Sequence, residues 1–148
     1  MLIDERGRNI SIGTDIVEID RFRNLEDASS FYHRVFSERE LAYCLGFSDP
    51  SPHFASTFAG KEAVFKATSS NCRATLRNIE ILREQDGAPY VELHQACNHD
   101  IYVSLSHSSS HAVAVAIAVH EAYSQDVNEI RGILEKTANQ ILPRSEVS

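Results

Sequence analysis

The stretch Phe58-Ala59-Gly60-Lys61-Glu62-Ala63-Val64-Phe65-Lys66-Ala67 decides how this chain folds. Alanine recurs at every fourth position from Ala55 to Ala67, which is the spacing of one face of a helix. The pattern predicts a long helix over residues 54–68, with a narrow alanine ridge against which another element can pack closely. Gly60 weakens this helix, because glycine lowers helix stability by about 1 kcal/mol relative to alanine.

Glu62 is the unusual residue of the predicted helix. It shares a face with Phe58, Phe65 and Lys66, which lie three or four residues away. Two interpretations are open. Glu62 and Lys66 form an ordinary ion pair on a solvated face, or the carboxylate and the ammonium belong to a functional site.

The composition indicates one folded domain. Of the 148 residues, 43% are hydrophobic and 24% are charged, which is enough to build a core. The net charge of −7 argues against nucleic acid or an anionic membrane as the main partner, because both attract basic surfaces. The sequence shows no signal peptide and no apolar run near the roughly 18 residues that cross a membrane. Cys44, Cys72 and Cys97 form no CxxC pair, so we expect reduced thiols and a cytoplasmic protein.

Two polar residues stand within apolar strand patterns. Residues 10–19 alternate as a strand, and Asp15 lies on the same face as Val17. A buried carboxylate is unfavourable unless it is paired or binds a metal, so Asp15 either belongs to a site or caps a strand end. Residues 101–107 alternate in the same way, and this pattern ends in His107.

The remaining patterns complete an α+β fold. Residues 113–119 alternate alanine with β-branched side chains, and together with residues 101–107 they predict the central hairpin of an antiparallel sheet that packs on the long helix. We further expect a helix over residues 31–36, a helix with the capping box Ser37–Glu40 that ends near Leu45, a loop over residues 46–53, and strands over residues 79–82 and 90–93 around the Asp86-Gly87 turn.

A zinc site is not expected over residues 94–99. His94, Cys97 and His99 are residue types that bind zinc. Within six residues, however, they leave no fourth ligand.

Asp15, Glu62 and His107 are the polar residues that the predicted strands and helix place in apolar surroundings. Two carboxylates suit Mg²⁺, which prefers oxygen ligands and completes its shell with water and phosphate oxygens. Lys61 and Lys66 are available to hold such phosphates, so this set outlines metal-assisted phosphoryl-group transfer. The sequence contains none of the P-loop, GxGxxG, GxSxG or HExxH motifs.

Five segments resemble, in the same order, the holo-acyl-carrier-protein synthases, which are small 4′-phosphopantetheinyl transferases. The segments are Ile12-Gly13-Thr14-Asp15-Ile16-Val17-Glu18-Ile19 with Arg21, Phe36-Ser37 with Glu40-Leu41, Phe58-Ala59 with Lys61-Glu62-Ala63 and Lys66-Ala67, Asp86-Gly87-Ala88-Pro89, and Val103-Ser104-Leu105-Ser106-His107 with the alanine-valine strand that follows. Each motif alone is weak, and the ordered set is specific.

The resemblance implies an activity. Such enzymes move 4′-phosphopantetheine from coenzyme A to a serine of an apo acyl or peptidyl carrier protein, as in fatty acid biosynthesis. They release adenosine 3′,5′-bisphosphate and require Mg²⁺. The chain would then be a transferase with coenzyme A as co-substrate and a carrier protein as partner.

The resemblance also implies roles for individual residues. Asp15 and Glu62 would bind the metal, which would bridge the coenzyme A diphosphate. Glu62, Lys66 and His107 would be catalytic, with Glu62 helping to deprotonate the serine and Lys66 protonating or neutralising the leaving phosphate. Arg21 would face the carrier protein. The residues that would contact coenzyme A are Lys61, Lys66, Ser106 and His107.

The same resemblance implies an architecture. The fold would be α+β, an antiparallel sheet packed against the long helix in a single copy. Three such chains would form a homotrimer with active sites between subunits. Residues 1–9 would be a lead-in, residues 10–119 the transferase domain, and residues 120–148 a helical extension. The helical pattern from Asp126 to Pro143 predicts contact with its own domain or with a neighbouring subunit.

The sequence departs from the family pattern at four places. Thr57 replaces an arginine, Ala88 replaces a lysine, and residues 68–72 lack the usual glycines. Residues 24–30, which the resemblance places against the carrier and which are usually basic, hold Glu26 and Asp27 and no cation. Fewer cations weaken the hold on phosphate. A second interpretation therefore stays open, in which the chain is a weakly active or inactive binding or assembly subunit.

Overall fold

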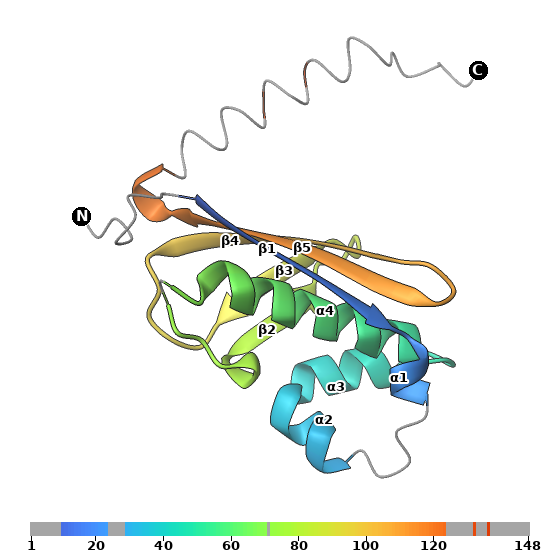
Figure 1. Ribbon diagram of the computed structural model, residues 1–148. Coiled ribbons are helices and arrows are strands. Elements are labelled where there is room, and N and C mark those ends of the chain that lie inside the picture. Colours follow the sequence, from blue (N-terminus) through green and yellow to red (C-terminus); the bar gives the residue numbers. More distant parts are fainter. Residues whose placement is uncertain (1–9, 24–28, 71, 124–131, 133–135, 137–148) are drawn as a thin grey trace.

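The computed structural model describes residues 10–23, 29–70, 72–123, 132 and 136. The predicted lead-in over residues 1–9 and nearly all of the predicted helix over residues 126–143 lie outside these ranges. The elements in chain order are β1 (Ile10–Glu18), α1 (Asp20–Arg23), α2 (Ser29–Val35), α3 (Glu38–Leu45), α4 (Ser51–Thr68), the 3₁₀ helix Leu76–Asn78, β2 (Ile79–Arg83), β3 (Pro89–Leu93), β4 (His99–His107), β5 (His111–His120) and the 3₁₀ helix Glu121–Tyr123 (Figure 1).

The strands form two antiparallel sheets. One has the order β1-β5-β4, and the other is the β2-β3 hairpin around the predicted Asp86-Gly87 turn. The predicted α+β class and the β4-β5 hairpin are confirmed, with β5 as the central strand of its sheet. The register matters for the site, because it aligns Asp15 with Ala114 and Leu105 in one row across the sheet.

Helix α4 lies along one face of the three-stranded sheet (Figure 1). The inward alanines of β5 have no exposed surface, and the predicted alanine ridge of α4 is likewise buried. The approach is closest at Gly13 of β1, where a Cβ atom would lie 2.0 Å from the carbonyl oxygen of Ala63. Gly60 fits for the same reason, since its missing side chain leaves room for Leu105 of β4 and Ile81 of β2. The weak helix former is therefore the residue that lets α4 lie between two sheets.

The starts of α3 and α4 illustrate two kinds of helix signal. The capping box is confirmed, because Ser37 accepts from the backbone N–H of Glu40 and the Glu40 side chain accepts from that of Ser37. Helix α4 begins at Ser51, within the predicted loop of residues 46–53. The loop prediction is wrong there because Pro52 occupies the first turn, where the missing N–H of proline has no intrahelical partner to lose.

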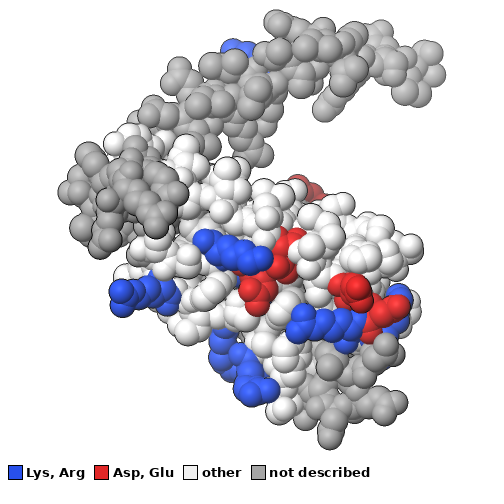
Figure 2. Space-filling view, in the orientation of Figure 1, with Lys and Arg blue, Asp and Glu red and all other residues white. Residues whose placement is uncertain are grey.

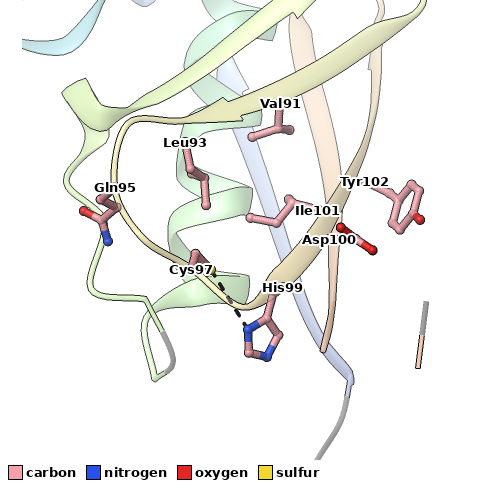
Figure 3. Close-up of a pocket in the computed structure, with 8 residues that line it drawn as sticks. All are labelled: Val91, Leu93, Gln95, Cys97, His99, Asp100, Ile101 and Tyr102. Carbon is pink, nitrogen blue, oxygen red and sulfur yellow. Dashed lines mark hydrogen bonds between the residues drawn. The ribbon is translucent and has the colours of Figure 1, made fainter. Parts of the chain in front are cut away.

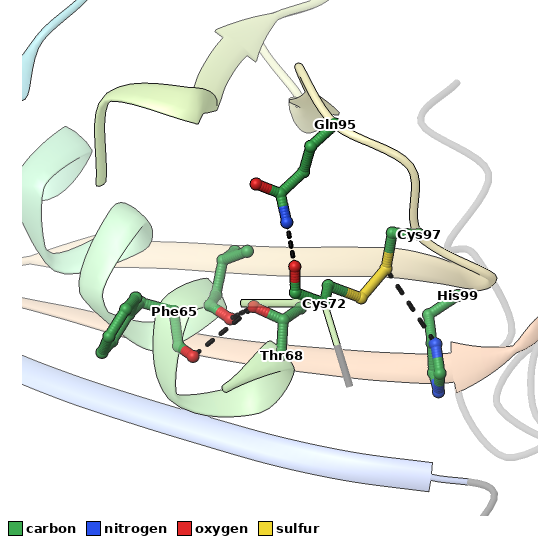
Figure 4. Close-up of a disulfide and its surroundings, with 7 residues drawn as sticks. Phe65, Thr68, Cys72, Gln95, Cys97 and His99 are labelled. Atoms are coloured by element: carbon green, nitrogen blue, oxygen red, sulfur yellow. Dashed lines mark hydrogen bonds between the residues drawn. A yellow bond between two sulfur atoms is a disulfide. The ribbon is translucent and has the colours of Figure 1, made fainter. Parts of the chain in front are cut away.

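The cysteines differ from the expectation of three reduced thiols. Cys72, just after α4, and Cys97, just before β4, form a disulfide across 25 residues of sequence (Figure 4). Cys44 is a free thiol, and burial raises its pKa to about 12. The spacing of the cysteines along the chain does not predict this disulfide, because Cys72 and Cys97 come together only when the chain folds.

The outer face of the three-stranded sheet is apolar and exposed. Its large side chains are exposed by 37–65%, and they alternate with the buried residues of β1 and β5. These residues are Ile10, Ile12, Ile16, Val113, Val115 and Ile117. Within the described residues, no helix combines the length and the apolar character that crossing a membrane requires.

Candidate active site

Asp15 meets α4 where β1 crosses it. Asp15 lies on the inward face of β1, and its side chain is 17% exposed. The Lys66 ammonium lies 2.9 Å from an Asp15 carboxylate oxygen and also donates to the carbonyl oxygen of Thr14 at 2.8 Å. Acidic and basic side chains lie side by side over this crossing (Figure 2). The interpretation of Asp15 as part of a charged site is therefore favoured over a strand-end cap.

Glu62 lies one turn before Lys66 and faces the same crossing. Partial burial raises the pKa of Glu62, and the negative charge of Asp15 raises it further, while Lys66 and Arg21 act in the opposite direction. None of the described side chains forms an ion pair with Glu62, since Lys66 is bound to Asp15. Two neighbouring carboxylates, only one of which is paired with a lysine, are an arrangement that a divalent cation would stabilise.

Arg21 and Phe58 border this cluster. The Arg21 guanidinium lies over the Phe58 ring, 5.3 Å from its centroid, and Arg21 is exposed. Phe58 itself is buried in a group of aromatic rings from α1, α2 and α4. This stacking holds an exposed cation at the rim of the site.

Lys61 does not reach the site, so its predicted contact with coenzyme A is wrong. The side chain has no exposed surface, and its ammonium lies 2.8 Å from a carboxylate oxygen of Glu40. It also donates to the carbonyl oxygen of Ile79. Burial lowers the pKa of Lys61, against the effect of Glu40. Lys61 is thus a buried structural ion, and it joins α4 to α3 and β2.

His107 lies apart from the carboxylates within this chain. It is aligned with Ala112 and Val17, two strands away from β1. Strand and residue spacings therefore separate the Cα atoms of Asp15 and His107 by roughly 12 Å. The centroid of the His107 ring lies 6.5 Å from that of the His53 ring at the start of α4. The His53 ring in turn stacks on the Phe47 ring, with 3.5 Å between the centroids.

Ser106 and His107 are both exposed but occupy opposite faces of β4. Ser106 is aligned with Val113 on the outer face, whereas His107 is aligned with buried Ala112. Burial lowers the pKa of His53, and the nearby His107 lowers it further. The described chain thus carries two clusters, one around Asp15, Glu62 and Lys66 and one around His107.

A sequence model of the 4′-phosphopantetheinyl transferase superfamily matches residues 11–118, which contain both clusters. The chain belongs to this superfamily. The resemblance of the five ordered segments is thereby confirmed, and so is the assignment as a transferase.

Two curated relatives are similar to most of this chain. The chain is 37% identical over 108 residues to the holo-[acyl-carrier-protein] synthase of Thermodesulfovibrio yellowstonii, and the match covers 72% of this chain and 95% of the relative. It is 40% identical over 119 residues to that of Caldicellulosiruptor saccharolyticus, covering 75% and 97%.

Solved structures of such synthases share the fold. The structure of the Bacillus anthracis synthase in complex with CoA (3′,5′-ADP) matches this chain with a TM-score of 0.65 and 28% identity. The match covers 74% of this chain and 96% of the Bacillus anthracis chain. That of Helicobacter pylori, in complex with coenzyme A, gives 0.62 at 28% identity and covers 72% and 98%.

The departures from the superfamily pattern have structural counterparts. Thr57 is fully buried, and its hydroxyl lies 3.8 Å from the Cys44 sulfur, so this position holds a core side chain. Ala88 is an exposed turn residue whose N–H donates to Asp86. The segment without glycines after α4 leads into Cys72, which is covalently held.

Sequence reasoning missed two features of the site region. Glu40 was identified only as a cap, yet it also pairs with Lys61 and accepts from the N–H of Ile81 at 2.7 Å. His53 was assigned to a loop. No local pattern signals either role, because each depends on contacts between elements far apart in sequence.

Proposed function

We propose that this chain transfers 4′-phosphopantetheine from coenzyme A to a serine of an apo carrier protein, with Mg²⁺, and releases adenosine 3′,5′-bisphosphate. The observation that carries this proposal is the cluster of Asp15, Glu62 and Lys66 at the β1–α4 crossing of a superfamily member. The relatives named as holo-[acyl-carrier-protein] synthases, and the solved ones that hold coenzyme A, support the substrate assignment.

The donor set suits Mg²⁺. Asp15 and Glu62 supply hard carboxylate oxygens, and burial and the charge of Asp15 raise the pKa of Glu62, which a bound cation would oppose. Asp15 already holds the Lys66 ammonium at 2.9 Å, which supports a role of this carboxylate in binding positive charge. Bound there, Mg²⁺ would neutralise charge on the coenzyme A diphosphate.

The reaction forms one bond and breaks one. The carrier serine oxygen attacks the phosphorus that carries pantetheine, and the bond from that phosphorus to the oxygen of the departing adenosine 3′,5′-bisphosphate breaks. Glu62 accepts the serine proton, a task that its raised pKa favours. Lys66 neutralises or protonates the leaving phosphate. Arg21, held over Phe58, faces the carrier.

The complete site is assembled between subunits of a homotrimer. Within one chain, the Cα atoms of Asp15 and His107 lie roughly 12 Å apart, and in this assembly a neighbour supplies His107 and Ser106 against coenzyme A. The exposed apolar face of the β1-β5-β4 sheet supports this assembly, because a patch of large apolar side chains is typical of subunit contacts.

The test is the mass of apo-carriers after incubation with the protein, coenzyme A and Mg²⁺. We expect a gain of one phosphopantetheine on a cognate carrier, no gain with a chelator, and no gain on a carrier whose serine is replaced by alanine. Coenzyme A binding without a gain on any carrier of a broad panel would contradict the proposal. It would favour a binding or assembly subunit instead.

A further inference from the structure

A disulfide joins two segments at the far end of α4 from His107. Cys72 follows α4, Cys97 precedes β4, and their Cα atoms lie 5.3 Å apart. The two sides of the bond differ in exposure, since Cys72 is 8% exposed and Cys97 is half-buried. A reagent from solvent therefore meets Cys97 first.

Cys97 opens onto a cavity that can hold a small molecule. The cavity has a volume of about 480 Å³ and is open to solvent, and Gln95, His99 and Asp100 contribute polar groups to its lining (Figure 3). This volume lies within the roughly 300–1,000 Å³ of small-molecule sites. Among the described residues, Cys72 does not line the cavity. The cavity therefore admits a small thiol to Cys97, whereas Cys72 is shielded.

His99 supplies a group that can move protons between the two sulfurs. Its Nδ1 lies 4.0 Å from the Cys97 sulfur (Figure 4), and a ring nitrogen and both sulfurs all lie within 4.8 Å of one another. The ring packs edge-on against buried His120, with 5.2 Å between the centroids. Imidazole gains and loses a proton near neutral pH, and the thiolate is the form of a thiol that attacks a disulfide. His99 is therefore placed to take the proton of an incoming thiol and pass it to the departing sulfur.

We propose that the Cys72–Cys97 bond is a site of thiol–disulfide exchange with low-molecular-weight thiols, in which Cys97 is the reactive sulfur and Cys72 the protected one. The incoming thiolate attacks the Cys97 sulfur, the bond to Cys72 breaks, and Cys72 receives through His99 the proton that the incoming thiol lost. A second thiol attacks the mixed disulfide, releases the Cys97 thiol and forms a small disulfide with the first. The protein thereby gains two electrons and two protons, and the two small thiols are oxidised to one disulfide.

Hydrogen bonds hold Cys72 in place independently of the disulfide. Its N–H donates to the carbonyl oxygen of Thr68 at 2.8 Å, and its carbonyl oxygen accepts from the Gln95 side chain. Gln95 precedes Cys97 by two residues, so this second bond joins the same two segments as the disulfide. The reduced thiols therefore stay close together, and Cys72 can resolve a mixed disulfide on Cys97. The exchange uses none of the residues proposed for phosphopantetheine transfer.

Two matched variants of the full-length protein test which sulfur reacts. Cys72→Ser leaves Cys97 at the cavity, and Cys97→Ser leaves Cys72 buried. With oxidised glutathione, we expect Cys72→Ser to gain the mass of one glutathionyl group at least about ten times faster than Cys97→Ser, because thiol reactivity requires access. Cys44 is the internal control in both variants, because burial raises its pKa to about 12 and keeps it a thiol. Equal rates, or a faster reaction of Cys97→Ser, would overturn the proposal.

The wild type gives a second test, which does not depend on the folding of a variant. After reduction with a phosphine, a short pulse of iodoacetamide followed by peptide mapping should label Cys97 before Cys72. In unlabelled reduced protein, one equivalent of oxidised glutathione should restore the Cys72–Cys97 bond and leave no glutathione attached, because Cys72 resolves the mixed disulfide. Earlier labelling of Cys72, or a lasting glutathionyl adduct, would contradict the assigned roles.

His99→Asn in the Cys72→Ser background tests the proton transfer. We expect its reaction with oxidised glutathione to slow by at least about tenfold, since proton transfer by a positioned imidazole typically contributes that much or more. His33→Asn in the same background is the control, because His33 lies exposed on α2, and its rate should match the background within about twofold. An unchanged rate for His99→Asn would contradict the role of His99.

Discussion

At the residue scale, Glu62 is held in an environment that opposes its charge. Burial comes first among the causes that raise its pKa above the ordinary value of 4.5, and Asp15 comes second. A raised pKa suits a catalytic base, because the carboxylate then binds a proton more readily near neutral pH. The same environment makes the carboxylate a liability for stability.

The pH dependence of stability tests this environment. Because the folded chain binds the Glu62 proton more tightly than the unfolded chain does, the contribution of Glu62 to stability is fully present below pH 4.5 and is lost as the pH rises through the folded pKa. We expect Glu62→Gln to unfold at a higher urea concentration than wild type at pH 7, with the difference vanishing near pH 4. Mg²⁺ should raise the Tm of wild type but not that of the variant. A variant that is less stable than wild type at pH 7 would show that Glu62 has a structural role.

Lys61 and Lys66 should respond to substitution in opposite ways. Lys61→Met leaves the Glu40 carboxylate buried without its partner, so we expect a loss of about 3–5 kcal/mol in the free energy of unfolding. The matched variant Lys66→Met removes a half-exposed ion pair, so stability should fall by less than about 1 kcal/mol while transfer is lost. Urea denaturation and transfer rates measure both. A stable Lys61→Met with a raised KM for coenzyme A would restore the original prediction for Lys61.

Some site residues could be predicted from the sequence and others could not. Asp15, Glu62 and Lys66 were identified because a charge within an apolar strand or helix face is visible locally, and the structure brings them together. Lys61 was misassigned because it precedes Glu62 by one residue and so points about 100° around the helix. Its partner Glu40 comes from another helix, and no local pattern reveals that contact.

At the element scale, the contact of β1 with α4 positions both carboxylates. Gly13→Ala tests it, because the added Cβ would lie 2.0 Å from the Ala63 carbonyl oxygen and 2.7 Å from the Ala67 nitrogen. Backbone atoms cannot yield as a flexible side chain does, so β1 and α4 must separate. We expect a destabilisation of about 3 kcal/mol. The rate of transfer per folded molecule should fall as well.

Gly46→Ala is the matched control for this substitution. Gly46 ends α3 with φ −71°, which any residue adopts, and it is exposed. Its free energy of unfolding should change by less than about 1 kcal/mol. Equal, small effects of the two substitutions in urea denaturation would refute the close approach of β1 and α4.

Elements were more predictable than their contacts. The alternating strands and the capping box were found because their signals lie within a few residues. The start of α4 was missed because proline signals a helix start and a loop equally well. The Cys72–Cys97 contact joins segments 25 residues apart, which no short pattern can report.

At the scale of the whole molecule, the proposed homotrimer with sites between subunits predicts complementation. Glu62→Gln and His107→Ala should each be nearly inactive when assayed alone. Mixed by unfolding and refolding together, they should recover about one quarter of the wild-type sites, because half of the subunits supply an intact Glu62 and half of their neighbours an intact His107. Light scattering should report three chains per particle. Mixed particles without recovered activity would place both residues in a site within one chain.

The most direct test of the central claim is the rate at which wild type and Glu62→Gln add mass to the same apo-carrier, with coenzyme A and Mg²⁺. Glu38→Gln is the control, because that carboxylate is 84% exposed on α3. We predict a gain of one phosphopantetheine on the carrier serine with wild type and the control, and a rate at least about 100-fold lower with folded Glu62→Gln. Equal rates for wild type and Glu62→Gln would contradict the proposed site.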